Sequence, residues 1–475
     1  MKDRVVPGVA APREAQSVQY VKICSLYGVG FYYIPGTDMC LKVGGWARFE
    51  TGYGYNGSFT TEWWNNDLRN RSTNENNWRV KGVITLDARS QTEYGTVRSY
   101  VALGESNNEN GDNPTTGNYF NRWFIQWAGF TFGHSTSFFD FYSIGANQYG
   151  FVSGGSDTGD GGWTVLGYTA QFGNGLSASI SAEQQRRTRI INANLGVGFI
   201  SGLAPAAGVG ATASNYEGHD YPDVVANLRI DQAWGSAQIM GALHNVATQY
   251  YDGDETTGHP DDKLGFAVGA GIKLNAPMIG PGDYFQVEVD YTQGASRYSN
   301  HTAVVSDYRM YDGNTFGFGF ESDAVFGGTP GTGDASALEL TTTWNVNAAY
   351  THFWNPAWKS TLWGAYRAVS YNDRANAILC SALGDGNGLA GALAVANPGC
   401  DANYSIWGIG LRTQWAVSST FQIGLEVLYA KLQSADSSTG LIALGANGTK
   451  PAGVYTIDDQ DNWAVRLRVN RDFYP

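Results

Sequence analysis

Polar and apolar side chains alternate along many short stretches of this chain. In WRVKGVITLDAR, residues 78–89, Arg79, Lys81 and Asp87 share one face of an extended strand, and the other face is apolar. Successive side chains of a strand point to opposite sides of a sheet, so one face is wet and the other is not. The pattern predicts half-buried antiparallel strands. It recurs in residues 41–53, 284–292, 421–429 and 463–473.

The connections between these segments alternate in length. About sixteen segments begin near residues 41, 77, 94, 119, 130, 162, 175, 221, 235, 262, 284, 341, 357, 402, 420 and 461. Short turns lie at 90–93, 129, 173–175, 234–235, 353–356 and 417–419, and long polar loops near 56–76, 105–118, 137–161, 187–219, 250–261, 297–340, 372–401 and 434–460. Such alternation is typical of a barrel with periplasmic turns and extracellular loops. We predict an all-β fold, a sixteen-stranded antiparallel transmembrane β-barrel.

Composition supports this fold and narrows the functions. The 475 residues include 62 Gly, 28 Tyr, 22 Phe and 15 Trp, a composition rich in sheet formers. The net charge of −13 argues against a nucleic-acid partner, which needs a basic surface. No stretch approaches about 18 consecutive apolar residues, so no transmembrane helix is expected. The first residues, MKDRVVPGVAAPREAQ, lack the apolar centre of a signal peptide, so we expect the mature form if the protein is exported.

Several blocks of sequence resemble a known family. They are YVKICSLYGVGFYYIPGTDMCLKVGG (20–45), FIQWAGFTFGHSTSFFDFY (124–142), SDTGDGGWTVLGYTAQFGNGLSASIS (156–181), RTQWAV (412–417) and RVNRDFYP (468–475). These blocks are similar to the porins of alphaproteobacteria. The resemblance implies a homotrimeric general-diffusion porin of the bacterial outer membrane, in contact with lipid and lipopolysaccharide, that passes small hydrophilic solutes and ions. Residues 1–40 are then expected to be an N-terminal periplasmic segment and residues 41–475 the transmembrane barrel.

The resemblance also implies an inward-folded constriction loop at residues 137–161, because this segment lies between the fifth and sixth expected strands. Asp157 and Asp160 are the expected acidic residues of the constriction. By strand parity, the opposing basic wall is expected to carry Lys42, Arg48, Arg79, Lys81 and Arg98. With acids on the loop, bases on the wall and many loop acids at the mouth, we expect a modest cation preference.

The four cysteines and the last residues have separate expected roles. Cys24 is expected to pair with Cys40, and Cys380 with Cys400, one of three possible connectivities; proximity and topology favour it, since a cross-pair would have to span the membrane. The chain ends DFYP, and Phe473 and Tyr474 resemble the assembly signal at the end of the last strand of bacterial barrels.

Three alternatives remain open at this point. A substrate-specific channel for a sugar or other small nutrient shares the fold. A barrel hydrolase would need a nucleophile and a base, but His134 and Ser135 are adjacent in a strand and point to opposite faces. The segments 252–262 and 154–162 vaguely resemble calcium loops. We expect no catalytic residues, no metal site and no cofactor.

Overall fold

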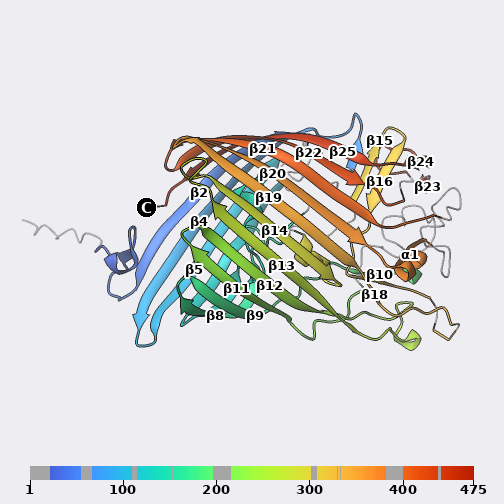
Figure 1. The fold of residues 1–475 in the computed structure, drawn as a ribbon, viewed down its shortest axis with the longest axis horizontal. Helices are drawn as coiled ribbons and strands as arrows, with labels where there is room; N and C mark the ends of the chain where they lie inside the picture. Colours follow the sequence, from blue (N-terminus) through green and yellow to red (C-terminus); the bar gives the residue numbers. More distant parts are fainter. Residues whose placement is uncertain are drawn as a thin grey trace, which may run out of the picture.

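A closed β-barrel makes up most of the molecule. The computed structural model describes residues 22–474 except 55–66, 110–114, 151–153, 196–214, 301–307, 329, 332, 381–398, 437–439 and 445. Sixteen strands form the barrel, and steeply tilted strands run its length in Figure 1. They are β2 (Cys40–Tyr53), β4 (Asn76–Thr92), β5 (Gly95–Glu109), β6 (Thr115–Trp127), β7 (Phe130–Ser135), β8 (Trp163–Gly173), β9 (Leu176–Glu183), β11 (Asp223–Gln232), β12 (Gly235–Val246), β13 (Lys263–Asn275), β14 (Tyr284–Gln293), β19 (Thr342–Asn355), β20 (Trp358–Ser370), β21 (Tyr404–Ser418), β22 (Phe421–Gln433) and β25 (Gln460–Asp472).

Every pair of neighbouring barrel strands is antiparallel, and β25 closes the barrel against β2. The register of this closure runs from Trp46 opposite Asp472 to Tyr53 opposite Val465. The predicted fold and strand count are confirmed, and each predicted start lies within a few residues of a barrel strand. The short connection at residues 276–283, between β13 and β14, is absent from the predicted turns.

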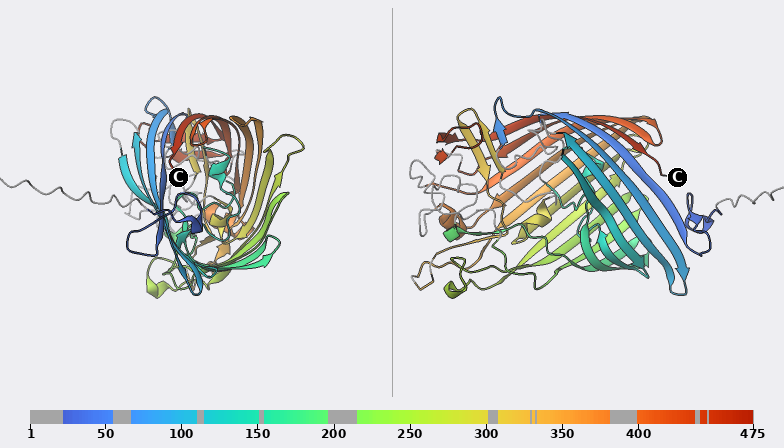
Figure 2. Two further views of the ribbon diagram at one scale, coloured as in Figure 1. Left: turned by 90° about the vertical axis from the view of Figure 1, so that its left-hand side faces the viewer. Right: turned by 180° about the vertical axis from the view of Figure 1, so that it is seen from behind.

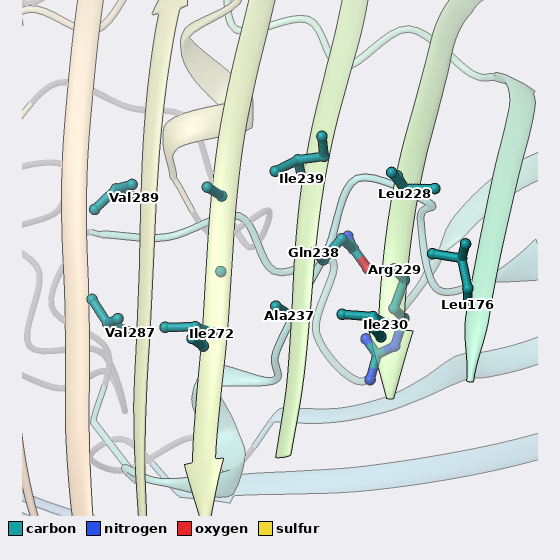
Figure 3. Close-up of a pocket in the computed structure, with 12 residues that line it drawn as sticks. Leu176, Leu228, Arg229, Ile230, Ala237, Gln238, Ile239, Ile272, Val287 and Val289 are labelled. Carbon is teal, nitrogen blue, oxygen red and sulfur yellow. The ribbon is translucent and has the colours of Figure 1, made fainter. Parts of the chain in front are cut away.

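The two faces of the wall have opposite polarity, as alternation predicts. On β4, Trp78, Val80 and Ile84 point outward and are about half exposed, whereas Thr85 and Asp87 point inward and are nearly buried. An apolar outer surface and a polar interior are typical of a membrane barrel. Across β11–β14 the outer wall has an apolar hollow of about 490 Å³, and Figure 3 shows the side chains that surround it. They include Leu228, Ile239, Ile272, Val287 and Val289.

The long loops carry small elements of their own, which the sequence did not predict. A five-stranded sheet contains β3 (Asp67–Arg69), β15 (Tyr308–Asp312), β16 (Thr315–Gly319), β23 (Leu441–Leu444) and β24 (Gly453–Ile457), and a three-stranded sheet contains β10 (Ile190–Asn192), β17 (Ala324–Phe326) and β18 (Glu339–Leu340). Helix α1 (Asp373–Cys380) lies at the same end of the barrel, opposite the C-terminus in Figure 1. None of the helices in the described ranges is long and apolar enough to cross a membrane.

A short N-terminal segment lies at the other end of the barrel, near the C-terminus (Figure 1). Strand β1 (Tyr32–Tyr33) pairs with the beginning of β2, and a 3-10 turn, η1 (Ser25–Tyr27), precedes it. Both predicted disulfides, Cys24–Cys40 and Cys380–Cys400, are formed. The other described 3-10 turns are η2 (Ile144–Ala146), η3 (Ala193–Leu195), η5 (Glu255–Thr257) and η6 (Ser296–Ser299).

Candidate functional site

The segment 137–161, which we call the inner loop, is described at residues 137–150 and 154–161, and these parts contact the inward face of distant strands. Seen along the barrel in Figure 2, left, the wall forms a ring with ribbon inside it. Glu183 at the end of β9 accepts hydrogen bonds from the Ser137 hydroxyl (2.6 Å) and the Phe138 N–H (2.9 Å). On the other side, Glu426 of β22 accepts from the backbone N–H groups of Tyr149 (2.8 Å) and Gly150 (2.6 Å). Buried carboxylates thus hold the inner loop at two well-separated parts of the wall.

A third anchor lies between these two, on β14 and β19. Glu288 accepts a hydrogen bond from the Ser156 N–H at 3.1 Å, and the Tyr142 hydroxyl donates to the side-chain oxygen of Asn347. Burial, and then the nearby charges of Glu288 and Asp157, raise the pKa of Tyr142 well above its ordinary value. The Tyr142 hydroxyl therefore stays protonated and keeps its role as a donor.

Glycines in the wall leave space for aromatic rings of the inner loop. The pairs are Phe138 with Gly167 of β8, Phe141 with Gly271 of β13 and Tyr149 with Gly424 of β22. A Cβ atom on Gly424 would lie 2.0 Å from the Tyr149 hydroxyl, closer than any real contact. The position of the inner loop therefore depends on missing side chains as well as on present ones.

The two acids expected in the constriction have different surroundings. Asp157 is buried, and its oxygens accept hydrogen bonds from the backbone N–H groups of Ile144 (2.8 Å) and Gly159 (2.7 Å). It therefore shapes the inner loop. Asp160 is exposed, and its charge acts on Lys81 and Arg122 of the facing wall. Of the two, Asp160 has the position of a lumen charge.

Three of the five expected basic residues come together on β2 and β4. Arg48 lies directly opposite Lys81, and Arg79 lies opposite Glu50 in the strand register. The Arg79 guanidinium donates to the fully buried Glu50 carboxylate at 2.8 and 2.5 Å. Arg48 donates to the side-chain oxygen of Asn470 at 3.1 Å.

Lys42 and Arg98 lie elsewhere, toward the end of the barrel that carries the short turns. The Lys42 ammonium donates to the carbonyl of Val29 in the N-terminal segment at 3.2 Å. Arg98 donates to Asp87 (3.1 and 3.0 Å) and to Gln126 (3.1 Å). The expected basic wall is therefore divided into two groups, and these two residues are outside the group that faces the inner loop.

The sequence reading missed the basic residues on the last strands. Arg412 of β21 and Arg466 of β25 flank Glu426 in the strand register and donate to carbonyls of the inner loop, those of Ala146 and Tyr149. Arg468 completes the Glu50 cluster with a 2.7 Å contact. The alternation in RTQWAV and WAVRLRVNRDF contains the signal, because its polar positions share the inward parity.

A second segment, residues 308–328, also reaches the inner wall. It was expected only as part of a long loop. Glu321 in this segment forms a buried ion pair with Arg367 of β20 (2.6 Å) and accepts a 2.7 Å hydrogen bond from the Tyr404 hydroxyl. The aromatic rings of Phe316, Phe318 and Phe320 are almost fully buried beside these contacts. Hydrophobic and aromatic side chains thus pack inside the loop-bearing end of the barrel.

Comparison with known proteins agrees with this architecture. A family model described as a porin subfamily matches residues 9–465. The chain belongs to that porin subfamily. It is 27% identical over 256 residues to porin Omp2b of Brucella melitensis biotype 1 and to its counterpart in Brucella abortus. Each match covers 51% of this chain and 61% of the relative, so the chain spans about three fifths of the length of these relatives.

A solved structure has the same fold. The outer membrane channel DcaP of Acinetobacter baumannii superposes with a TM-score of 0.57 at 15% identity, over 93% of this chain and 99% of that one. Membership of the porin subfamily, together with a closed barrel that is apolar outside, locates this porin in the bacterial outer membrane.

Proposed function

We propose that this porin forms a water-filled channel for passive diffusion of small hydrophilic solutes and ions. The observation that carries the proposal is the inner loop, which is held across a polar lumen by Glu183, Glu288 and Glu426. A sixteen-stranded barrel is wide enough to enclose an aqueous channel. We propose that the inner loop narrows this channel and leaves a water-filled path. Such a narrowing selects solutes by size and charge.

The selectivity is proposed to depend on Asp160 against Arg48 and Lys81. A charge acts strongly on a passing ion only within about a Debye length, ~8 Å at physiological salt, so these side chains outweigh distant loop acids. The modest cation preference expected from the sequence stays a prediction, supported by exposed Asp160 and by the net charge of −13.

Reconstitution in a planar bilayer tests the proposal. We expect stepwise conductance and a reversal potential in a salt gradient that moves toward anions in Asp160→Asn and toward cations in Lys81→Gln. Both variants leave the backbone contacts of the inner loop in place, unlike Asp157→Asn. Absence of conductance steps would reject the channel. An unchanged reversal potential in both variants would mean that the constriction lies elsewhere.

The remaining alternatives have less support. His134, which a hydrolase would need, contacts the Thr164 hydroxyl at 3.2 Å, and neighbouring Ser135 has the opposite parity on β7. In the segment read as a calcium loop, Asp254 accepts hydrogen bonds from the Thr256 N–H (2.8 Å) and hydroxyl (2.6 Å) as the cap of a 3-10 turn. The described residues contain no group of three or more potential metal-binding side chains.

We further propose that this porin assembles as a homotrimer, with lipid and lipopolysaccharide around the rest of its apolar wall. The support is a polar area on the outer face of β5 and β6. Glu105 is exposed there and lies opposite Gly82 on one side and Asn118 on the other. An outward carboxylate within an apolar row is costly against lipid, and a neighbouring subunit can hydrate or bind it.

A further inference from the structure

A small cavity with a strongly basic lining lies between residues 145–149 of the inner loop, which we call its tip, and the inner wall. Its volume is about 220 Å³. Its charged residues are Arg48, Lys359, Arg412 and Arg468, and its other lining residues are Gly145, Ala146, Tyr149, Gln414, Gln422 and Asn470. We call it the basic cavity.

Of the described residues that line the basic cavity, four are cationic and none is acidic. Two carboxylates neighbour this lining and already have partners. Glu50 pairs with Arg79 and with Arg468 of the lining itself, and Glu426, opposite Arg412 in the strand register, binds backbone N–H groups of the inner loop. Arg468 is thus partly neutralised, and the other cations of the lining, Arg48, Lys359 and Arg412, repel one another in a partly dehydrated place, so an anion among them is favoured.

Arg412 has an unsatisfied donor in this lining. Arg412 is 2% exposed, one guanidinium N–H donates to the Ala146 carbonyl, and the guanidinium lies 4.9 Å from the centre of the Tyr149 ring, but its Nε has no hydrogen-bond partner among the described residues. A buried guanidinium with unsatisfied donors costs free energy unless another group accepts from it. Lys359, whose ammonium lies 5.5 Å from the Phe353 ring, adds a second cation to the same cavity.

The amide side chains of the lining are already oriented. Gln414 donates to the Tyr149 hydroxyl (3.0 Å) and to Gln422 (3.1 Å), and Asn470 accepts from Arg48 (3.1 Å). These contacts fix the lining before any ligand arrives, which lowers the entropic cost of binding.

From these contacts we infer that the basic cavity is a binding site for a small oxyanion, a phosphate or a short carboxylate, on the path of solutes through the channel. Arginine forks match both kinds of oxyanion better than they match chloride. At about 30 Å³ for each water, the cavity holds about seven waters, which is room for one such anion. The inference rests on the proposed channel function and adds a solute class to it.

Single-channel recording at constant ionic strength tests the inference. Potassium phosphate or potassium acetate replaces part of the potassium chloride. We expect phosphate, acetate or both to reduce the chloride current in a saturable way. In the double variant Lys359→Gln, Arg412→Gln the half-blocking concentration should rise about tenfold or more, since each cation contributes charge-assisted hydrogen bonds. Comparison of the two salts separates phosphate from carboxylate binding.

Lys273→Gln is the matched control. Lys273 is also an inward lysine near a short turn, 4.4 Å from the ring of Tyr284, and lies outside the basic cavity. Conductance steps in chloride without any oxyanion block in the unmodified porin would overturn the inference and leave the channel function intact. An equal loss of block in Lys273→Gln would also overturn it.

If the double variant fails to insert, calorimetric titration of the folded unmodified porin with phosphate and with acetate decides, and absence of saturable heat for both rejects the site.

Discussion

At the scale of single residues, Glu50 is a buried acid of the wall that is surrounded by arginines. It is fully buried and accepts hydrogen bonds from Arg79 (2.8 Å) and Arg468 (2.7 Å), and Arg466 lies 3.7 Å away. Glu50→Gln leaves these guanidinium groups without their counter-charge. Removal of one partner from a buried ion pair costs about 3–5 kcal/mol, so we expect a clear loss of stability.

The loss is measured as the urea midpoint at which the folded, fast-migrating form disappears from unheated gels. Glu93→Gln is the control, because Glu93 is an exposed acid in the short turn between β4 and β5. Equal midpoints for the two variants would mean that the Glu50 cluster contributes little. The alternation of polar and apolar residues correctly assigns Glu50 and Arg79 to one face of the wall. Alternation does not show that the two side chains neutralise each other.

At the scale of elements, Gly424 fixes where the tip of the inner loop lies. We expect Gly424→Ala to push Tyr149 away from β22 and weaken the contacts of Glu426, at a cost of about 1–3 kcal/mol for overpacking. The single-channel conductance should rise, because the tip moves away from its anchor. Gly364→Ala on β20 is the control, since a Cβ there meets only the Gly408 carbonyl at 3.7 Å. A conductance that rises equally in both variants would contradict this role of Gly424.

The same elements show what the sequence predicts and what it leaves out. Alternation locates every barrel strand because the pattern is local: each residue only has to face lipid or water. The path of the inner loop is not local, since it depends on Glu183, Glu426 and Gly424 from strands hundreds of residues apart in the chain. The buried pair of Glu321 with Arg367 escapes prediction for the same reason.

At the scale of the whole molecule, the C-terminal residues complete the closure of the barrel. The Phe473 N–H donates to the Gly45 carbonyl at 2.9 Å, and the rings of Phe473 and Tyr474 occupy the space beside Gly45 and Gly44. Deletion of residues 472–475 should therefore reduce the amount of protein inserted in the outer membrane, while the channels that do insert keep their conductance. Fractionation followed by single-channel recording measures the two effects separately, and equal insertion with and without the tail would contradict an assembly role.

Glu105 on the outer wall permits a test of the homotrimer. The direction in which Glu105→Leu changes stability depends on whether Glu105 faces lipid or a neighbouring subunit. Glu105 lies beside Gly82, between Val80 and Ile84, which are 54% and 55% exposed on the same outer face. If this face meets lipid, Glu105→Leu removes a charge from hydrocarbon and stabilises the porin. If it meets a second subunit, the same change removes a polar contact, and we expect the oligomer to dissociate at a lower temperature. Heating detergent extracts before electrophoresis measures the dissociation temperature, with circular dichroism as the check that the barrel itself stays folded. The dissociation temperature of Glu105→Gln, which keeps the shape and hydrogen-bonding capacity, should lie between those of the unmodified porin and Glu105→Leu. A higher dissociation temperature in Glu105→Leu than in the unmodified porin would reject this face as the subunit interface.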